Sequence, residues 1–332
     1  MARSARATIT QVARTAGVSL STVSRVMNGN PTVDAALAER VREVAAELGY
    51  SANPLARSLV LGRTQTVAVV IPDLANPTFQ SILRGLSRAA SDDGFHVLIA
   101  DTAEQVAEEA TLATATRRRT DGVILCAPRM PADDLAALLP SLSPVVVVNR
   151  PPQEATPTVA ADYRVGMAQL VQHVYDLGHR RVAYLAGVVG SASGAARRSA
   201  LDEALTAHPD LEIIEIASGV DFDSGAGSAD AVMAADVTAV LAFNDLVAMG
   251  LLSAVGDRGI RVPEDLSIAG FDDIPFARYT TPPLTTAAVP GLELGQEAWQ
   301  AMSALLEGRD AATSTVRDPA LVVRGSTGPR PS

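Results

Sequence analysis

Residues 8–28 read Thr-Ile-Thr-Gln-Val-Ala-Arg-Thr-Ala-Gly-Val-Ser-Leu-Ser-Thr-Val-Ser-Arg-Val-Met-Asn, and this stretch predicts two short helices joined by a tight turn. Thr8 is suited to cap a first helix from about Ile9 to Ala16, and Gly17 can adopt the left-handed conformation that ends it. Ser19 is suited to cap a second helix that runs to about residue 28. Two helices at this spacing are typical of a helix-turn-helix, whose second helix enters the major groove of DNA.

Apolar residues at helical spacing form the interior of this segment. The first two helices share a face made of Ile9, Val12, Ala13, Val18, Val23 and Val26. A third helix is expected from about residue 34 to residue 48, and its core positions are Leu37, Val41, Val44, Ala45 and Leu48. Three helices around one small core predict an all-α head.

Polar residues and an arginine occupy the outward face of the second predicted helix. Arg25 can donate two hydrogen bonds to a guanine, Ser21 can bond a base or a phosphate, and Leu20 can touch a thymine methyl group. Arg25 could instead contact phosphate only, because half or more of protein–DNA hydrogen bonds go to the backbone. The predicted DNA contacts are completed by residues expected at the phosphates or the helix start, namely Thr8, Thr22, Ser24 and Asn28.

The charge of the chain is divided unevenly between this head and the rest. The 332 residues carry a net charge of −10, and all 27 basic residues are arginines. Residues 1–63 hold eight arginines and four acidic residues, which gives +4, so the remainder carries −14. A small basic segment on an acidic body is expected where only one end of a protein meets nucleic acid.

Short apolar runs alternate with amphipathic stretches after residue 63, as in an α/β protein. The predicted strands are Thr66–Ile71, His96–Ala100, Gly122–Cys126, Val145–Val148, Arg181–Leu185, Glu212–Ile216, Ala239–Phe243 and Leu266–Ala269. Several are apolar at nearly every position, which is typical of parallel strands covered on both faces. Eight strands exceed one small wound sheet, so we predict two doubly wound parallel sheets, in two lobes, with a ligand cleft at the carboxyl ends of the strands.

Several classes of protein are not favoured by the sequence. The single cysteine, Cys126, excludes a disulfide within the chain, and no histidine has metal-ligand spacing with it or with another histidine. No apolar signal segment follows Met1 and no run of eighteen apolar residues occurs, so we expect a cytoplasmic protein without a membrane partner. No cofactor, metal site or catalytic residue is predicted.

The run from Thr8 to Asn28, together with the stretch from Leu48 to Leu59, resembles the lactose and galactose repressor (LacI/GalR) family of transcription regulators. In that family the second stretch is a hinge that becomes helical on DNA. The resemblance implies hinge contacts from Asn53, Ala56, Arg57 and Leu59. Asn53 would cap the hinge helix, and Leu59 would insert into the minor groove and bend the duplex. From its chemistry alone, Leu59 would instead pack against the core.

The body resembles the rest of that family and, with it, the two-lobed periplasmic sugar-binding proteins. The matching segments are Ile71–Phe79, Leu177–Arg181, Phe243–Asp245, Gly259–Pro263, Gly270–Asp273 and Pro282–Thr286. Position by position, the resemblance implies an effector-binding set of Phe79, Asn149, Arg150, Arg197, Phe222, Asn244 and Asp272. In such a set arginine donates in a fixed fork, carboxylate and amide oxygens accept, and a flat ring covers the C–H face of a sugar.

These effector residues also have plainer interpretations. Asp272 could cap the following helix, and Arg197 could pair with a surface acid. Phe79 and Phe222 could be ordinary core residues, which is the commoner fate of a phenylalanine.

The resemblance also divides the chain into domains. The expected ranges are 1–50 for the helix-turn-helix domain, 51–63 for the hinge helix and 64–332 for an effector-binding and dimerisation core. In the core, a first lobe would hold about 64–161 and 291–318, and a second lobe about 162–290 and 319–326. We expect two chains to pair mostly through first-lobe helices such as Phe79–Ser91.

The sequence therefore predicts a homodimeric DNA-binding transcription regulator, acting as a repressor, with a near-palindromic double-stranded operator and a carbohydrate effector as its partners. A nucleobase, another metabolite or a protein partner are alternative signals. A cytoplasmic sugar-binding protein or an enzyme on the same body fold is a further alternative, but neither class needs a helix-turn-helix or a basic head.

Overall fold

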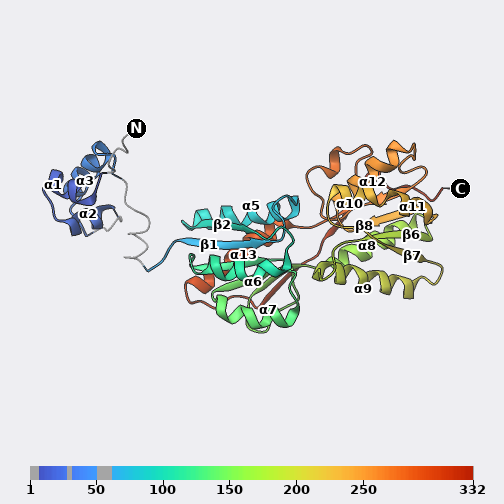
Figure 1. The fold of residues 1–332 in the computed structure, drawn as a ribbon, viewed down its shortest axis with the longest axis horizontal. Coiled ribbons are helices and arrows are strands. Elements are labelled where there is room, and N and C mark those ends of the chain that lie inside the picture. Colours follow the sequence, from blue (N-terminus) through green and yellow to red (C-terminus); the bar gives the residue numbers. More distant parts are fainter. Residues whose placement is uncertain (1–6, 28–31, 51–61, 332) are drawn as a thin grey trace. The chain divides into compact units, whose positions relative to one another are not determined.

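The computed structural model describes residues 7–27, 32–50 and 62–331, and the chain forms two compact units, Met1–Gln65 and Thr66–Ser332 (Figure 1). Five of the predicted DNA contacts lie outside the described residues: Asn28, Asn53, Ala56, Arg57 and Leu59.

The first unit contains three helices, α1 (Ile9–Ala16), α2 (Leu20–Met27) and α3 (Ala35–Glu47). The Thr8 side chain caps α1, and the Gln11 side chain reaches back to accept a hydrogen bond of 2.7 Å from the Thr8 amide. Gly17 ends the helix with a φ of 67°, as its left-handed position requires. The amide of Thr22 donates to the Ser19 hydroxyl oxygen at the start of α2. The predicted helix-turn-helix is therefore confirmed.

The interior of the head differs from the prediction along α3. Ala38, Val41 and Ala45 face the small core, whereas Leu48 is 39% exposed and Leu37 is only half-buried. The buried stripe runs i, i+3, i+7 from Ala38. The prediction was therefore right at Val41 and Ala45 and missed Ala38, while Val44 packs against the core without being fully buried.

A six-stranded parallel sheet forms the first lobe of the second unit, in the order β11-β5-β4-β3-β1-β2. Its strands are β1 (Thr66–Ile71), β2 (His96–Asp101), β3 (Gly122–Cys126), β4 (Val145–Val148), β5 (Thr158–Ala161) and β11 (Ser314–Arg317). Its helices are α5 (Pro77–Asp92), α6 (Val106–Arg117), α7 (Ala132–Leu138), a short 3-10 helix η1 (Leu139–Leu142) and α13 (Gly291–Leu306). Along β1, Val67 and Val69 pack with α5 and α13, and Ala68 and Val70 pack with α6 and α7. Both faces of the sheet are therefore covered by helices.

A four-stranded parallel sheet in the order β7-β6-β8-β9 forms the second lobe. The strands are β6 (Arg181–Ala186), β7 (Glu212–Ala217), β8 (Ala239–Ala242) and β9 (Ser267–Ala269). The helices are α8 (Tyr163–Asp176), α9 (Ala192–Ala207), α10 (Phe222–Gly227), α11 (Ala229–Ala234), α12 (Asp245–Asp257) and the short η2 (Ala277–Tyr279). The prediction of two doubly wound parallel sheets is confirmed. None of the described helices is long and apolar enough to cross a membrane.

Four short strands were not predicted. Two of them, β5 and β11, extend the first sheet, and β10 (Thr286–Ala288) pairs antiparallel with β12 (Ala320–Val322). Each has only three or four residues, which is too short for a periodic pattern to mark it as a strand.

Helices α5 and α13 cross at close range because two glycines remove the side chains that would separate them. A Cβ on Gly295 would overlap the carbonyl oxygen of Ile82 and would lie 2.7 Å from the amide nitrogen of Leu86. A Cβ on Gly85 would overlap the carbonyl oxygen of Leu292. Both obstacles are backbone atoms, so the helices themselves would have to move apart.

We predict that Gly295→Ala lowers the free energy of unfolding by about 1–3 kcal/mol or more, as overpacking of a tight core does. The matched control is Gly256→Ala in α12, where nothing lies within 4 Å of the added Cβ. It should raise stability by roughly 0.5–1 kcal/mol through helix propensity. Urea unfolding followed by circular dichroism measures both, and equal effects of the two variants would contradict the packing argument.

Candidate functional site

The outward face of α2 carries most of the described residues that were predicted to contact DNA. Leu20 is 49% exposed, and Ser21 and Arg25 are also exposed. Val23 and Val26 point into the head core. Thr8 is exposed at the start of α1, whereas Thr22 and Ser24 are half-buried. The helix therefore presents an arginine, a hydroxyl and a leucine on one accessible side.

A cavity lies between the two lobes of the second unit, at the carboxyl ends of both parallel sheets. It is lined by Asn76, Thr78, Phe79, Ala127, Arg129, Asn149, Tyr163, Ser193, Arg197, Val220, Phe243, Asn244 and Asp272. Lining segments follow β1, β3, β4 and β5 in the first sheet and β6, β7, β8 and β9 in the second. This is where open α/β sheets bind ligands. The volume of the cavity is about 30 Å³ in this structure, so a ligand of sugar size requires the lobes to separate.

The structure brings together five of the seven predicted effector residues: Phe79, Asn149, Arg197, Asn244 and Asp272. Arg150 lines a neighbouring hollow beside Pro151 and Ala196, and its guanidinium donates to the carbonyl oxygen of Pro128. Phe222 is 46% exposed on α10 and does not line the cavity.

Several residues of the cavity wall were not predicted from the sequence, chiefly Thr78, Arg129, Tyr163, Ser193 and Phe243. Each lies at or just after the end of a parallel strand, or in the first turns of the helix that follows. That position is a signal available in the sequence, because ligand-binding residues gather at strand ends.

Arg197 is the most deeply buried charged side chain of the site, with 1% of its surface exposed. Its guanidinium carbon lies 4.1 Å from the ring centre of Phe271, 4.4 Å from that of Phe243 and 4.6 Å from that of Tyr163. Its Nη2 is 3.9 Å from an Asp272 oxygen, beyond hydrogen-bond range, and its Nε and Nη1 have no hydrogen-bond partner. Since buried donors are costly when unmatched, this side chain is poised for acceptors that a ligand would bring.

Asp272 faces Arg197 and reaches the first lobe through a hydrogen bond. The hydroxyl of Thr78, on α5, donates to it over 2.8 Å. Burial raises the pKa of Asp272 from 3.8 to about 6, although the charge of Arg197 and the Thr78 hydrogen bond oppose the rise. Its backbone adopts a φ of 110°, which aspartate tolerates better than most residues. The carboxylate is thus a buried acceptor at the meeting of the two lobes.

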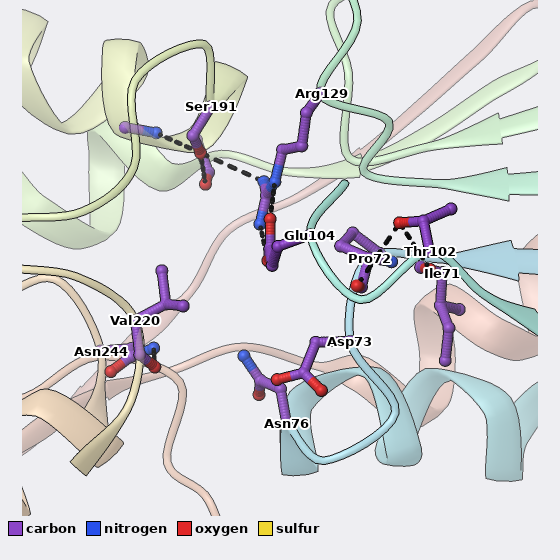
Figure 2. Close-up of polar contacts among 12 residues, drawn as sticks. Ile71, Pro72, Asp73, Asn76, Thr102, Glu104, Arg129, Ser191, Val220 and Asn244 are labelled. Atoms are coloured by element: carbon purple, nitrogen blue, oxygen red, sulfur yellow. Dashed lines mark hydrogen bonds and ion pairs between the residues drawn. The ribbon is translucent and has the colours of Figure 1, made fainter. Parts of the chain in front are cut away.

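Arg129 crosses from the first lobe to the second and is 8% exposed (Figure 2). Its Nε and Nη2 donate to the two carboxylate oxygens of Glu104 at 3.0 Å each, and its Nη1 donates to the Ser191 hydroxyl at 3.3 Å. Ser191 in turn caps α9, the helix that carries Arg197. The buried carboxylate of Glu109 fixes the backbone at Arg129, because it accepts hydrogen bonds from the amides of Arg129 and Met130.

The two asparagines are held by backbone groups. Asn244 caps α12 through its side-chain oxygen, and its side-chain nitrogen donates to the carbonyl oxygen of Val220, a neighbour visible in Figure 2. Asn149 accepts from the amide of Ala161 with a φ of 55°. Both residues therefore shape the cavity wall as well as lining it.

This arrangement suits a ligand that offers both donors and acceptors. Arg197 provides donors, Asp272 provides an acceptor, and the Phe79 ring supplies an apolar surface. Within the described ranges, no three His, Cys, Asp or Glu side chains converge in a way that would hold a metal ion.

The head and the core each match a family of known proteins. Residues 8–53 match the family model for bacterial regulatory proteins of the lacI family, and residues 171–327 match that for a periplasmic binding protein-like domain. The HTH-type transcriptional repressor CytR of Escherichia coli K12 is 33% identical over 328 residues, which cover 97% of this chain and 96% of CytR.

Two solved structures are similar over nearly the whole chain. A lac repressor dimer bound to operator and the anti-inducer ONPF has a TM-score of 0.88 at 27% identity and covers 98% of this chain and 100% of its own. A complex of the transcriptional regulator CelR with cellobiose has a TM-score of 0.72 at 31% identity and covers 97% and 100%.

The raised pKa of Asp272 predicts a pH-dependent stability. The native state binds this proton more tightly than the unfolded state, whose carboxyl has its ordinary pKa of 3.8. The stabilising contribution is therefore complete below about pH 4 and is lost as the pH rises through about 6. We expect the wild type to lose up to about 3 kcal/mol across this window relative to Asp272→Asn.

Urea unfolding of both chains between pH 4 and pH 7 measures the difference. Asp245, a second buried carboxyl nearby, is present in both chains, but the charge of Asp272 helps to raise the pKa of Asp245, so the measured difference includes the coupling between the two carboxyls. Parallel pH profiles for the two chains would show that Asp272 titrates normally.

Proposed function

The chain belongs to the lacI family of bacterial regulatory proteins, and from this membership we propose that it is a transcriptional repressor whose operator affinity is controlled by a carbohydrate bound between the core lobes. Its relatives by sequence are transcription regulators, so the chain acts by binding rather than by catalysis. CelR, with which it shares the fold, was solved with cellobiose.

The observation that carries the effector assignment is the buried Arg197 beside Asp272. A sugar hydroxyl can accept from a guanidinium and donate to a carboxylate at the same time. Arg197 already covers the rings of Tyr163, Phe243 and Phe271, so these rings are less open to stacking by a flat nucleobase. The cavity chemistry therefore favours a hydroxyl-rich ligand over an aromatic one.

Membership of the lacI family also implies a function for each part of the chain. Residues 1–50 read the operator, 51–63 form the hinge helix, and 64–332 bind the effector and pair two chains. In the hinge, Asn53 caps the helix, Ala56 and Arg57 lie against DNA or the partner hinge, and Leu59 unstacks a base step. The effector changes the separation of the two hinges, and so the affinity of the head for DNA.

Dimer formation follows from the symmetry of the target. The lac repressor structure that resembles this chain is a dimer on its operator. A dimer with one head on each chain calls for a near-palindromic operator, because twofold protein symmetry is mirrored in the two half-sites. A regulator that binds operator DNA works in the bacterial cytoplasm.

Arg25→Ala is expected to remove operator discrimination. A lost bidentate contact to guanine lowers the affinity for the correct base by about 1–3 kcal/mol and leaves the phosphate contacts intact. The measurement is fluorescence anisotropy on a duplex selected from random sequences and on a scrambled duplex, at two salt concentrations. The control is Arg42→Ala, an exposed arginine on α3 that pairs with Glu39. If Arg25→Ala keeps the wild-type ratio of affinities, Arg25 contacts only phosphate.

Arg197→Ala is expected to abolish the effector response while sparing operator binding. Loss of a charged donor from a desolvated site weakens binding by ~30-fold or more. Thermal-shift screening of the full chain against sugars identifies the ligand, and titration then compares the variants. The control is Arg198→Ala, which removes the next arginine of α9, an exposed one paired with Glu215. A normal response of Arg197→Ala would place the effector elsewhere.

A further inference from the structure

We propose that Glu104 sets the charge selectivity of the effector cavity, restricting it to uncharged carbohydrates and excluding sugar phosphates and sugar acids. The inference rests on the proposed function and narrows its effector class. Glu104 does not itself line the cavity; it acts through Arg129, which does.

The geometry of the Glu104–Arg129 pair is that of mutual neutralisation. Both carboxylate oxygens accept from the guanidinium, in the parallel two-bond arrangement that is the strongest pairing of these groups. The Arg129 side chain is 7% exposed and that of Glu104 is 23% exposed, so solvent screens the pair only partly. Three of the five N–H groups of Arg129 are engaged by Glu104 and Ser191.

The second guanidinium of the cavity is also opposed by a carboxylate, although no hydrogen bond joins the two groups. Arg197 faces Asp272 at 3.9 Å, and at pH 7.5 that carboxyl is ionised because burial raises its pKa only to about 6. The two arginines that line the cavity are therefore each opposed by one carboxylate, and the nearby buried Arg150 and Glu109 add one further charge of each sign. Figure 2 shows a further acid, Asp73, beside Asn76 on the side of the cleft that belongs to the first lobe.

An anionic ligand would meet these carboxylates, and each arginine that lines the cavity already has a carboxylate opposite it. To bind Arg129 it would have to displace Glu104, and a displaced carboxylate in a buried setting is itself costly. At the free Nε and Nη1 of Arg197 it would still lie close to the carboxylate of Asp272. A neutral sugar need not displace either carboxylate, because its hydroxyl oxygens can accept hydrogen bonds from the guanidinium N–H groups that have no other partner. An anionic ligand is therefore rejected because the carboxylates beside the cavity carry the same sign of charge.

The experiment replaces Glu104 by glutamine, which keeps the shape and one acceptor oxygen but removes the charge. The probes are matched pairs: D-glucose with glucose 6-phosphate, D-galactose with galacturonate, and cellobiose with cellobionate. Binding to the full chain is measured by calorimetry and thermal shift at pH 7.5 and constant ionic strength. The control is Glu108→Gln, an exposed acid four residues further on, which makes the same change in net charge.

We expect the wild type to bind the neutral member of a pair at least ~10-fold tighter than the anionic member. Glu104→Gln should reduce this ratio by about 10-fold or more, mainly by raising the affinity for the anion, because Arg129 is then unmatched. Glu108→Gln should leave the ratio unchanged. Glu104→Asp, which keeps the charge on a shorter side chain, should keep the preference for neutral sugars and guards against a folding defect in the glutamine variant.

The possible contrary results are distinct. The inference is wrong if the wild type prefers the anionic member, if Glu104→Gln keeps the wild-type ratio, or if Glu108→Gln shifts the ratio as much. If no carbohydrate of either kind binds the wild type, the proposed effector class fails and this inference fails with it.

Discussion

The buried guanidinium of Arg197 is the constraint on which the core depends. A charge with 1% exposure must be compensated by its surroundings, and here three aromatic rings and one carboxylate do so. Tyr163 comes from the start of α8, Phe243 from the end of β8, and Phe271 follows β9. The guanidinium therefore ties several elements of the second lobe together, and it leaves two donors for whatever enters the cavity.

The same atoms that line the cavity also join the two lobes there. The hydroxyl of Thr78, in the first lobe, donates to Asp272 in the second lobe. The guanidinium of Arg129, also in the first lobe, donates to Ser191 in the second. A ligand that bonds Asp272 or Arg129 must compete with these contacts or add to them. Its binding energy then differs between arrangements of the lobes, which is the condition for a ligand to shift a conformational equilibrium. Effector sensing and lobe arrangement are thus linked through shared hydrogen-bonding groups.

Local patterns were predictable from the sequence, and long-range arrangement was predictable only in part. The capped helices of the head and fully apolar strands such as Thr66–Ile71 depend on neighbours in the chain, so their ends agree with the prediction. Strands β5 and β11 pair with each other although Thr158 and Ser314 are 156 residues apart (314 − 158), and no local signal marks them. The position of Arg129 just after β3 could be read from the sequence, but its role could not, because its partners Glu104 and Ser191 come from distant segments. Family resemblance supplied Arg197, but only the structure revealed its unmatched donors.

Because each arginine that lines the cavity is opposed by a carboxylate, the charge of the cavity can change independently of the fold. The fold, the strand ends and the aromatic cage are set by many residues, so they resist change. The charge of the cavity wall is set by few carboxylates, of which Glu104 lies at the partly exposed end of its pair. A single substitution there changes the electrostatics without disturbing the core, because Glu109 and not Glu104 fixes the backbone beneath Arg129. Within this architecture, a different partner for a buried arginine can therefore change the charge that the cavity accepts while the arginine stays in place.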